Sequence, residues 1–377
     1  GAVVLFITAL VAWPLTYWPH KALCQFILSS KTSAGEGITG AVTHYYGKKI
    51  GSLITTLYFI AFFVVVLIYA VAITNSLTEQ LAKHITIDLR IRMLVSLGVV
   101  LVLNLMPKKI ETECQFLRLL SNTPIQVNVE FLQVSSHVSK NTNKMHLDAF
   151  YHTFAEIQNE YYDGCIITGA PVEHLSFADV DYWEELQQIM EWTKTHVFST
   201  MHICWGALAG LHYHFGIPKY DLPEKMFGVF PHAVLQKNVQ LLRGFDDRFY
   251  APHSRHSEVR RADIEQVPNL KILTESPQAG VHIVANTNGR QYFITGHLEY
   301  DRMTLAGEYF RDKEKGCKIA VPAHYFPDDD PSKPPLYTWG CCANLLFANW
   351  INHCVYQLTP YDLQRLELYN WEWEAGL

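Results

Sequence analysis

The sequence lacks the features that mark several common protein classes. Its eight cysteines are scattered over 377 residues and form no C-x-x-C pair, which excludes a secreted disulfide framework and favours reduced thiols in the cytoplasm. Lys and Arg total 30 against 36 Asp and Glu, so nothing indicates a nucleic-acid partner. No charged region precedes the first apolar residues, which argues against a signal peptide. Because the chain begins at Gly1 without an initiator Met, we expect a piece of a longer protein.

Charged residues are scarce, at 18% of the chain, and they are unevenly distributed. Residues 1–106 contain seven Lys or Arg and three Asp or Glu, a net charge of +4. The remaining residues contain 23 and 33, a net charge of −10. The hydrophobic content of 49% excludes a disordered chain but not a membrane segment. The two parts therefore require separate interpretations.

The N-terminal part contains two uncharged apolar runs, Gly1–Trp18 and Ile50–Ser76. About twenty such residues span a bilayer, so the second run predicts a transmembrane helix. The alternative is a buried helix of a large soluble protein. The loop between the runs, Lys21–Lys49, contains four Lys and one Glu and is expected to face the cytoplasm. Residues 1–78 would then associate with the inner membrane.

Four segments of this part resemble the bacterial serine/threonine (hydroxy/aromatic amino acid) permeases over residues 1–105. They are Trp13–Leu23, Phe26–Lys31, Ile50–Tyr58 and Tyr69–Asn75. The resemblance implies that residues 1–100 are a partial permease of two to three transmembrane helices, which inserts into a membrane if expressed. Transporters of this kind bind their cargo between repeats at the bilayer midplane, so we expect no transport by this fragment.

The run Met93–Met106 lies where the two parts meet. It is short for a membrane helix, whereas Val99–Leu105 has the continuous Val and Leu content of a buried parallel strand. We place a fusion point near Leu101–Met106, and both a natural gene fusion and an assembly artefact remain open.

After Met106, short β-branched runs alternate with helical stretches, which predicts an α/β fold with a parallel sheet and flanking helices. The residues Ser176–Asp179 fit a capping box ahead of a helix that includes Trp183, Leu186 and Met190. Sites in such sheets lie at the carboxyl ends of the strands. The predicted strands are Val127–Val134, Cys165–Thr168, Val197–Cys204, Leu270–Thr274, Val281–Ala285 and Gln291–Thr295.

Cys204 lies at such a strand end. A strand-like run, Phe198–Ile203, precedes it and a predicted helix, Trp205–His214, follows it. A sharp strand–nucleophile–helix turn requires small residues nearby, and Gly206 supplies one. Cys204 is therefore a candidate nucleophile above a helix N-terminus, and a buried core cysteine is the alternative.

A second group of candidate catalytic residues directly follows the predicted strand Gln291–Thr295. Residues i and i+2 of an extended segment share a face, so His297 and Glu299 can form a base and its orienting carboxylate. Together with Cys204 they would make a Cys–His–Glu triad. A surface histidine with a nearby glutamate is the alternative for this pair alone.

Residues 101–363 resemble the homoserine O-acyltransferases, which comprise succinyl- and acetyl-transferring enzymes. The resemblance implies a flavodoxin-like α/β domain similar to the class I glutamine amidotransferases, lacking its N-terminal stretch and followed by a tail at 364–377. It also implies a cytoplasmic homodimer. The matching segments are Asn104–Glu113, Gln115–Pro124, Thr168–Pro171, Asp181–Trp183, Gly216–Lys219, Arg243–Asp246, Ala251–Arg255 and Asn344–Phe347.

The same resemblance implies roles for individual residues. Cys204 would form the acyl thioester, His297 would act as base and acid, and Glu299 would orient it. Acyl transfer would be ping-pong, from an acyl-CoA co-substrate to Cys204 and then to the hydroxyl of L-homoserine, in methionine biosynthesis without a bound cofactor. Lys225, Ser254 and Arg311 would contact the substrate, Glu308 and Arg311 would bind the amine and carboxylate of homoserine, and Lys109 would lie near the acyl site.

Glu173 bears on the identity of the acyl donor. The family has either Gly or Glu at this position, two residues after the Thr-Gly-Ala-Pro loop. A glutamate would fill the space and repel the carboxylate of succinate, so we favour acetyl-CoA over succinyl-CoA. Ser254 is a second position expected to affect donor choice. The alternative is that Glu173 points into solvent.

Three departures from the family pattern keep other hypotheses open. Leu298 replaces a Pro, Leu208 replaces a Gln, and Gly340–Ala343 replaces an Arg-Ser-His-type segment. An inactive fusion, and a glutamine amidotransferase or cysteine peptidase on the same fold, are the alternatives. We predict no metal site, because Cys341 and Cys342 lack a ligand set with suitable spacing. Nor do His212 and His214, two positions apart on a predicted helix, share a face.

Overall fold

The computed structural model describes residues 21, 42–57, 98–137 and 141–359. The chain divides into two compact units, residues 1–87 and residues 88–377. In the first unit, residues 42–57 are helical. Among the residues that the structure describes, no helix combines the length and apolarity needed to cross a membrane. The apolar run at 1–18, most of the run at 50–76 and the tail at 364–377 lie outside the described residues.

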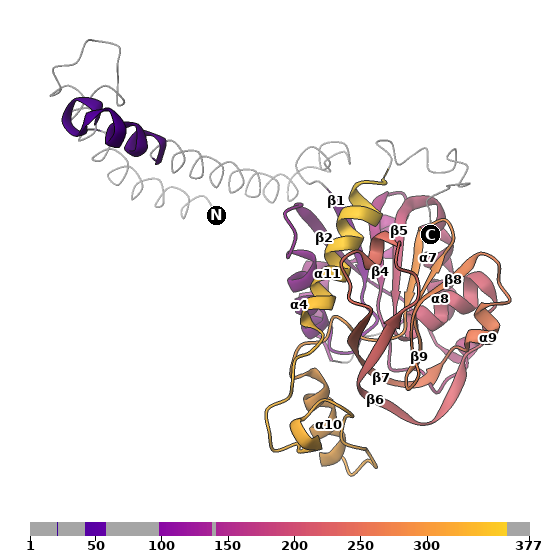
Figure 1. Ribbon diagram of the computed structural model, residues 1–377. Coiled ribbons are helices and arrows are strands. Elements are labelled where there is room, and N and C mark those ends of the chain that lie inside the picture. Colours follow the sequence, from indigo (N-terminus) through magenta and orange to yellow (C-terminus); the bar gives the residue numbers. More distant parts are fainter. Residues whose placement is uncertain (1–20, 22–41, 58–97, 138–140, 360–377) are drawn as a thin grey trace. The chain divides into compact units, whose positions relative to one another are not determined.

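The second unit is an α/β domain around one ten-stranded sheet, which confirms the predicted fold class (Figure 1). The strand order is β3-β2-β1-β4-β5-β10-β9-β8-β6-β7, parallel as far as β10 and antiparallel from β9 onward. The strands are β1 Gly98–Leu103, β2 Val127–Gln133, β3 Tyr151–Thr153, β4 Tyr162–Ile167, β5 Val197–Ile203, β6 Tyr220–Val234, β7 Arg248–Glu258, β8 Leu270–Ser276, β9 Gly280–Asn286 and β10 Gln291–Ile294.

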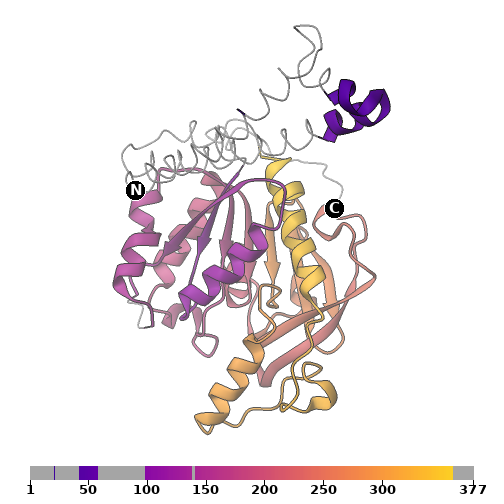
Figure 2. The same ribbon diagram turned by 90° about the vertical axis from the view of Figure 1, so that its left-hand side faces the viewer.

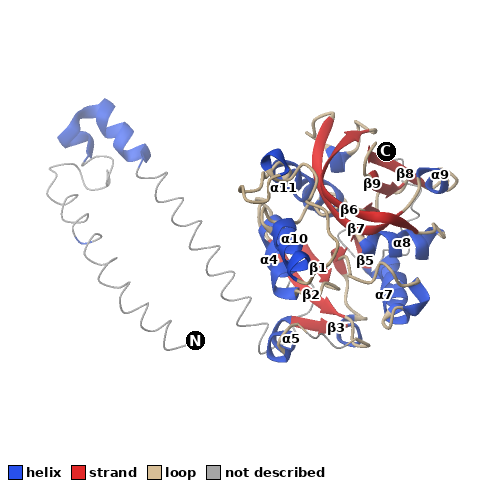
Figure 3. Ribbon diagram, turned by 90° about the horizontal axis from the view of Figure 1, so that it is seen from below, coloured by secondary structure: helices blue, strands red, loops and turns tan. Residues whose placement is uncertain are grey.

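Helices cover both faces of the parallel strands, with α4 and α11 on one face and α7 and α8 on the other (Figures 2 and 3). Short helical turns connect several of the strands. The longer helices are α4 Lys109–Leu120, α7 Trp183–His196, α8 Trp205–Phe215, α10 Thr304–Glu314 and α11 Gly340–Asn349, and the shorter ones are α5 Lys144–Phe150, α6 Phe154–Ile157 and α9 Arg261–Ile264.

Strand β1 shows why the fold has two hydrophobic cores. Side chains alternate across a strand, so Val100 and Val102 pack into one core while Val99, Leu101 and Leu103 pack into the other. All five are almost completely buried. A continuous Val and Leu run suits a central parallel strand because both of its faces are covered by helices. The strand alternative for the Met93–Met106 run is therefore correct for Gly98–Leu103.

The predicted capping box at Ser176–Asp179 is wrong. The Ser176 hydroxyl donates to the Asp179 carboxylate at 2.7 Å and makes no bond to a backbone N–H of the turn. The turn at Phe177–Asp179 is a separate 3₁₀ helix, and α7 begins only at Trp183. Because the Ser176 hydroxyl is bonded to the Asp179 side chain, it does not accept from a backbone N–H as a capping residue would.

The long antiparallel pair β6 and β7 was missed from the sequence. Pro223, Pro231 and Pro252 interrupt these runs, and proline usually argues against a strand. The sheet order explains Pro252, because β7 is an edge strand and proline is tolerated at edges. Strand β6 pairs with β8 only at Ala233 and Val234, so Pro223 and Pro231 lie outside that ladder. In Figures 1 and 2, α10 lies beyond the lower ends of this pair. Strands β6 and β7 and helix α10 supply one wall of the candidate site.

Candidate active site

Cys204 occupies a strained turn between β5 and α8. Its backbone has φ of 52° and ψ of −118°, a left-handed conformation that is rare for a residue other than glycine. Its N–H donates to the carbonyl of Ile294 on the neighbouring strand β10 at 2.7 Å, which ties the turn to the sheet. The predicted strand–nucleophile–helix arrangement is present, with Cys204 at the carboxyl end of β5 and at the N-cap of α8.

Gly206 permits this turn to approach the adjacent loop. A Cβ atom at position 206 would lie 2.6 Å from the Thr168 carbonyl oxygen and 2.8 Å from that of Ile167. We expect Gly206→Ala to lower the free energy of unfolding by about 1–3 kcal/mol, because backbone atoms must move to admit the methyl group. Denaturant unfolding measures the change.

Gly307→Ala is the matched control for that substitution. Gly307 also lies in a helix, α10, but a Cβ atom there would have no heavy atom within 4 Å beyond its chain neighbours and its own helix backbone. Alanine should there raise stability by up to about 1 kcal/mol, through its higher helix propensity. Equal effects of the two substitutions would contradict the steric account of Gly206.

His297 and Glu299 form a buried pair directly after β10. The Nδ1 atom of His297 lies 2.6 Å from Oε1 of Glu299, and the residues are 2% and 5% exposed. Burial by itself lowers the pKa of His297, but the charges of Cys204 and Glu299 and its hydrogen bonds to both raise that pKa well above its usual value. The ring of Tyr300 stacks on His297 with centroids 4.1 Å apart. His297 and Glu299 are therefore in contact with Leu298 between them in the chain.

Three buried histidines support the turn that carries His297. His232, His253 and His282 place their ring nitrogens within 4.8 Å of one another, the one group of described residues that could hold a metal ion. A Cβ atom at Gly296 would lie 2.9 Å from Nε2 of His282, so this cluster packs directly beneath the turn. Sequence reasoning missed the cluster because its members come from β6, β7 and β9.

A chain of hydrogen bonds runs from the Arg255 guanidinium through His253 and His232 to a backbone carbonyl. Arg255 Nε donates to Nδ1 of His253 at 3.3 Å, Nε2 of His253 and His232 lie 3.0 Å apart, and Nδ1 of His232 meets the Phe230 carbonyl at 2.9 Å. Burial lowers the pKa of His232 to about 3 and that of His253 well below its usual value. The Arg255 guanidinium alongside opposes a metal cation at this position.

Glu173 is buried beside the nucleophile rather than directed into solvent, so the solvent-facing alternative is wrong. It is 8% exposed, with Oε1 3.9 Å from the Cys204 sulfur and Oε2 accepting the His256 N–H at 2.7 Å. Burial raises the pKa of Glu173, against the opposing effects of the His256 hydrogen bond and nearby positive charges. The side chain occupies the space next to the sulfur whether or not it carries a charge.

A charged wall faces Cys204 across a cavity of about 260 Å³. Glu308, on α10, accepts from Ser254 Oγ at 2.5 Å and from Lys225 Nζ at 3.3 Å through the same oxygen. The guanidinium of Arg311, one turn further along α10, contacts Asp312 at 2.7 Å. Lys225, Ser254, Glu308 and Arg311 therefore line the same cavity as Cys204, Glu173 and His297. Tyr300 and Asp312, which the sequence did not single out, also line it.

Lys109 is the predicted site residue that does not line this cavity. Its ammonium group is buried and donates to the carbonyl of Asn104, and burial lowers its pKa to about 8 against the opposing charge of Glu113. It lines a neighbouring cavity instead, together with residues that follow β1, β2 and β4.

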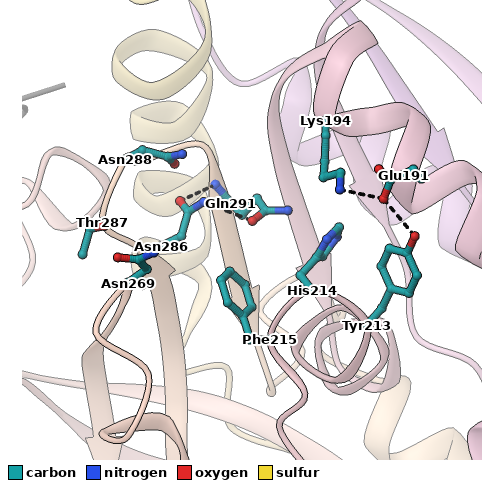
Figure 4. Close-up of a pocket in the computed structure, with 10 residues that line it drawn as sticks. All are labelled: Glu191, Lys194, Tyr213, His214, Phe215, Asn269, Asn286, Thr287, Asn288 and Gln291. Carbon is teal, nitrogen blue, oxygen red and sulfur yellow. Dashed lines mark hydrogen bonds and ion pairs between the residues drawn. The ribbon is translucent and has the colours of Figure 1, made fainter. Parts of the chain in front are cut away.

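Another cavity, of about 570 Å³, lies at the opposite end of β5 and β10 from Cys204. Figure 4 shows its lining residues. Glu191 there contacts Lys194 at 2.6 Å and Tyr213 at 2.9 Å, and Asn286 donates to Gln291 at 3.0 Å. Gln291 begins β10, whereas Cys204 follows the end of β5, and these strands are parallel. This cavity shares no lining residue with that of Cys204.

The other two departures from the expected pattern lie in α8 and at the start of α11. Leu208 is 1% exposed in α8 and belongs to the core beneath that helix. In the segment Gly340–Ala343, Gly340 and Ala343 are buried whereas Cys341 is exposed. The preceding Trp339 donates through Nε1 to the Tyr300 carbonyl at 2.9 Å. All seven cysteines of the described residues are free thiols.

The fold and the site together define an α/β enzyme built around a Cys–His–Glu constellation. A family model described as homoserine O-succinyltransferase matches residues 75–361. The homoserine O-acetyltransferase of Acetivibrio thermocellus is 60% identical over 266 residues, which cover 71% of this chain and 87% of that protein. The enzyme of the same name from Clostridium beijerinckii is 61% identical over 265 residues, covering 70% and 87%.

The chain belongs to the homoserine O-acyltransferase family, and it is an acyltransferase. The expected resemblance of residues 101–363 is thereby confirmed. Among solved structures, a glutamine amidotransferase from Thermotoga maritima aligns with a TM-score of 0.46 and 12% identity, over 68% of this chain and 98% of that one. The resemblance of residues 1–105 to permeases stays a prediction.

Proposed function

We propose that this protein transfers an acetyl group from acetyl-CoA to the hydroxyl of L-homoserine through a thioester on Cys204. The observation that carries the proposal is the buried assembly of Cys204, His297, Glu299 and Glu173 at the end of β5. The relatives named homoserine O-acetyltransferase, at about 60% identity, support the choice of acceptor and of acyl group.

The first half-reaction acylates the cysteine. The raised pKa of His297 keeps a proton on the imidazole, and the N-terminus of α8 favours negative charge at the sulfur. The Cys204 thiolate attacks the thioester carbonyl, the bond from carbonyl carbon to CoA sulfur breaks, and the leaving CoA thiolate takes the proton from His297. The products are acetyl-Cys204, free CoA and a neutral imidazole.

The second half-reaction uses that neutral imidazole as a base. His297 removes the hydroxyl proton of homoserine, the oxygen attacks the acetyl carbonyl, and the carbon–sulfur bond to Cys204 breaks. This returns the thiolate and the protonated imidazole and releases O-acetylhomoserine. The charged wall suits the acceptor, because Arg311 and Lys225 are cations for its carboxylate and Glu308 is an anion for its amine.

The acyl donor provides the direct test of this proposal. Purified protein should transfer acetyl faster than succinyl, because the Glu173 side chain occupies the space that a longer acyl chain would need. We expect Glu173→Gly to raise the ratio of kcat/KM for succinyl-CoA to that for acetyl-CoA by about tenfold or more. Steady-state rates with both thioesters and homoserine measure the ratio.

Leu175→Gly is the matched control for Glu173→Gly. It removes a side chain from the same loop, but Leu175 is 43% exposed and does not line the cavity. Its donor ratio should equal that of the native protein. An unchanged ratio in Glu173→Gly, or succinyl preference in the native protein, would contradict the proposed role of Glu173.

A further inference from the structure

A second cavity, of about 180 Å³, adjoins the cavity of Cys204. The two cavities share Met106, Pro107 and Pro171 as lining residues. The second cavity lies among the loops that follow β1, β2 and β4. Strand β1 pairs with β2 on one side and with β4 on the other, so the order of the strands changes direction at β1. Ligands of open α/β sheets bind at such a switch in strand order, outside the carboxyl ends of the strands.

The second cavity has a mainly apolar interior, one buried cation in Lys109, and a polar margin. Leu105, Val134 and Tyr182 form its buried part, at 9%, 6% and 4% exposure. At the margin, His137 Nδ1 lies 2.6 Å from the Asp181 carboxylate and links the loop after β2 to the segment before α7. A mainly apolar lining with a few polar groups at its edge is the usual composition of a small-molecule site.

The cavity of Cys204 is itself asymmetric. The side formed by β6, β7 and α10 carries Lys225, Ser254, Glu308 and Arg311, which suit a zwitterionic acceptor. The lining that it shares with the second cavity, Met106, Pro107 and Pro171, carries no charge. The uncharged lining of the Cys204 cavity is therefore continuous with the second cavity.

We infer that the pantetheine arm of the acyl-CoA donor binds in this second cavity, with its sulfur end at Cys204 and its nucleotide end outside. This inference rests on the proposed function, because it assumes that the donor is a CoA thioester. The arm combines an apolar gem-dimethyl segment with two amides. Leu105, Val134 and Tyr182 match the former, and Gln133 and His137 at the margin are hydrogen-bonding groups for the latter.

Binding of desulfo-CoA, which cannot react, tests the inference directly. Gln133→Trp places an indole in the second cavity from the last residue of β2, and His137→Trp does so from a side chain that is 43% exposed and tolerates replacement. We expect both variants to raise the Kd of desulfo-CoA by about tenfold or more. Asn128→Trp, at an exposed position of the same strand, should bind as the native protein does.

Acyl transfer from donors of different length provides the second readout. The two cavity variants should raise KM for acetyl-CoA and for S-acetylpantetheine by a larger factor than they change kcat/KM for S-methyl thioacetate, which lacks the arm, and Asn128→Trp should change none of these values. Native affinity for desulfo-CoA in both variants, or no binding to the native protein, would overturn the inference. If the proposed function failed instead, desulfo-CoA would still bind to the native protein but no acetyl group would be transferred to homoserine.

Discussion

Replacement of Cys204 by alanine is expected to lower kcat/KM for acyl transfer to homoserine by about 10⁴-fold or more. In the proposed ping-pong reaction the acetyl group is carried by this sulfur, so its removal leaves only binding and orientation of the two substrates. The strained backbone at Cys204 and its bond to Ile294 hold the sulfur at the cavity, and among the described residues no other cysteine lines that cavity. Initial rates with acetyl-CoA and homoserine measure the loss.

Cys317→Ser is the matched control for this experiment. Cys317 is an exposed free thiol outside the cavity, so its replacement should leave kcat/KM at the native value. Intact-mass measurement after mixing with acetyl-CoA alone should show one added acetyl group in the native protein and in Cys317→Ser, but none in Cys204→Ala. Substantial transfer by Cys204→Ala would rule out the thioester mechanism.

Glu299→Gln is expected to lower kcat/KM by about 10²- to 10⁴-fold. The glutamate raises the pKa of His297 through its charge and through the 2.6 Å hydrogen bond, while burial acts in the opposite direction. Without that charge, burial should lower the pKa of His297, so the imidazole would lose its proton at a lower pH than in the native protein. The amide can also stabilise the wrong tautomer of the ring.

Two measurements separate this role from a loss of folding. An NMR titration of the His297 ring should show the lower pKa in Glu299→Gln, and Glu299→Asp, which restores the charge, should recover part of both the pKa and the rate. Glu184→Gln, on the exposed start of α7, should change neither quantity. An unaltered His297 titration in Glu299→Gln would contradict the assigned interaction.

Much of the sheet was predictable because its strands are covered on both sides. Burial on both faces selects apolar residues, which the sequence displays as a continuous Val and Leu run at β1 and as shorter apolar or β-branched stretches at β4, β5 and β9. The antiparallel pair β6 and β7 has partly exposed faces and contains prolines, so its sequence has no such run. Its strand character depends on pairing with distant residues, which local sequence does not reveal.

The triad was predictable for a different reason. Cys204 and the His297–Glu299 pair each follow a recognisable strand, and parallel neighbouring strands end at the same edge of a sheet. Strand order was needed to show that β5 and β10 are neighbours. The resemblance placed Lys109 only near the acyl site. In the structure Lys109 follows β1 and lines the second cavity, which adjoins that of Cys204.

The amino-acid sequence by itself determined the α/β class, the nucleophile turn with its required Gly206, and the short-range pairing of His297 with Glu299. These depend on periodicity, backbone sterics and residues two positions apart, all of which are local. Only the tertiary structure decided that Glu173 turns toward the sulfur, that three histidines of separate strands support the base, and that a second cavity opens beside the first. Those features join residues far apart in the chain, and packing and burial, rather than local preference, place them.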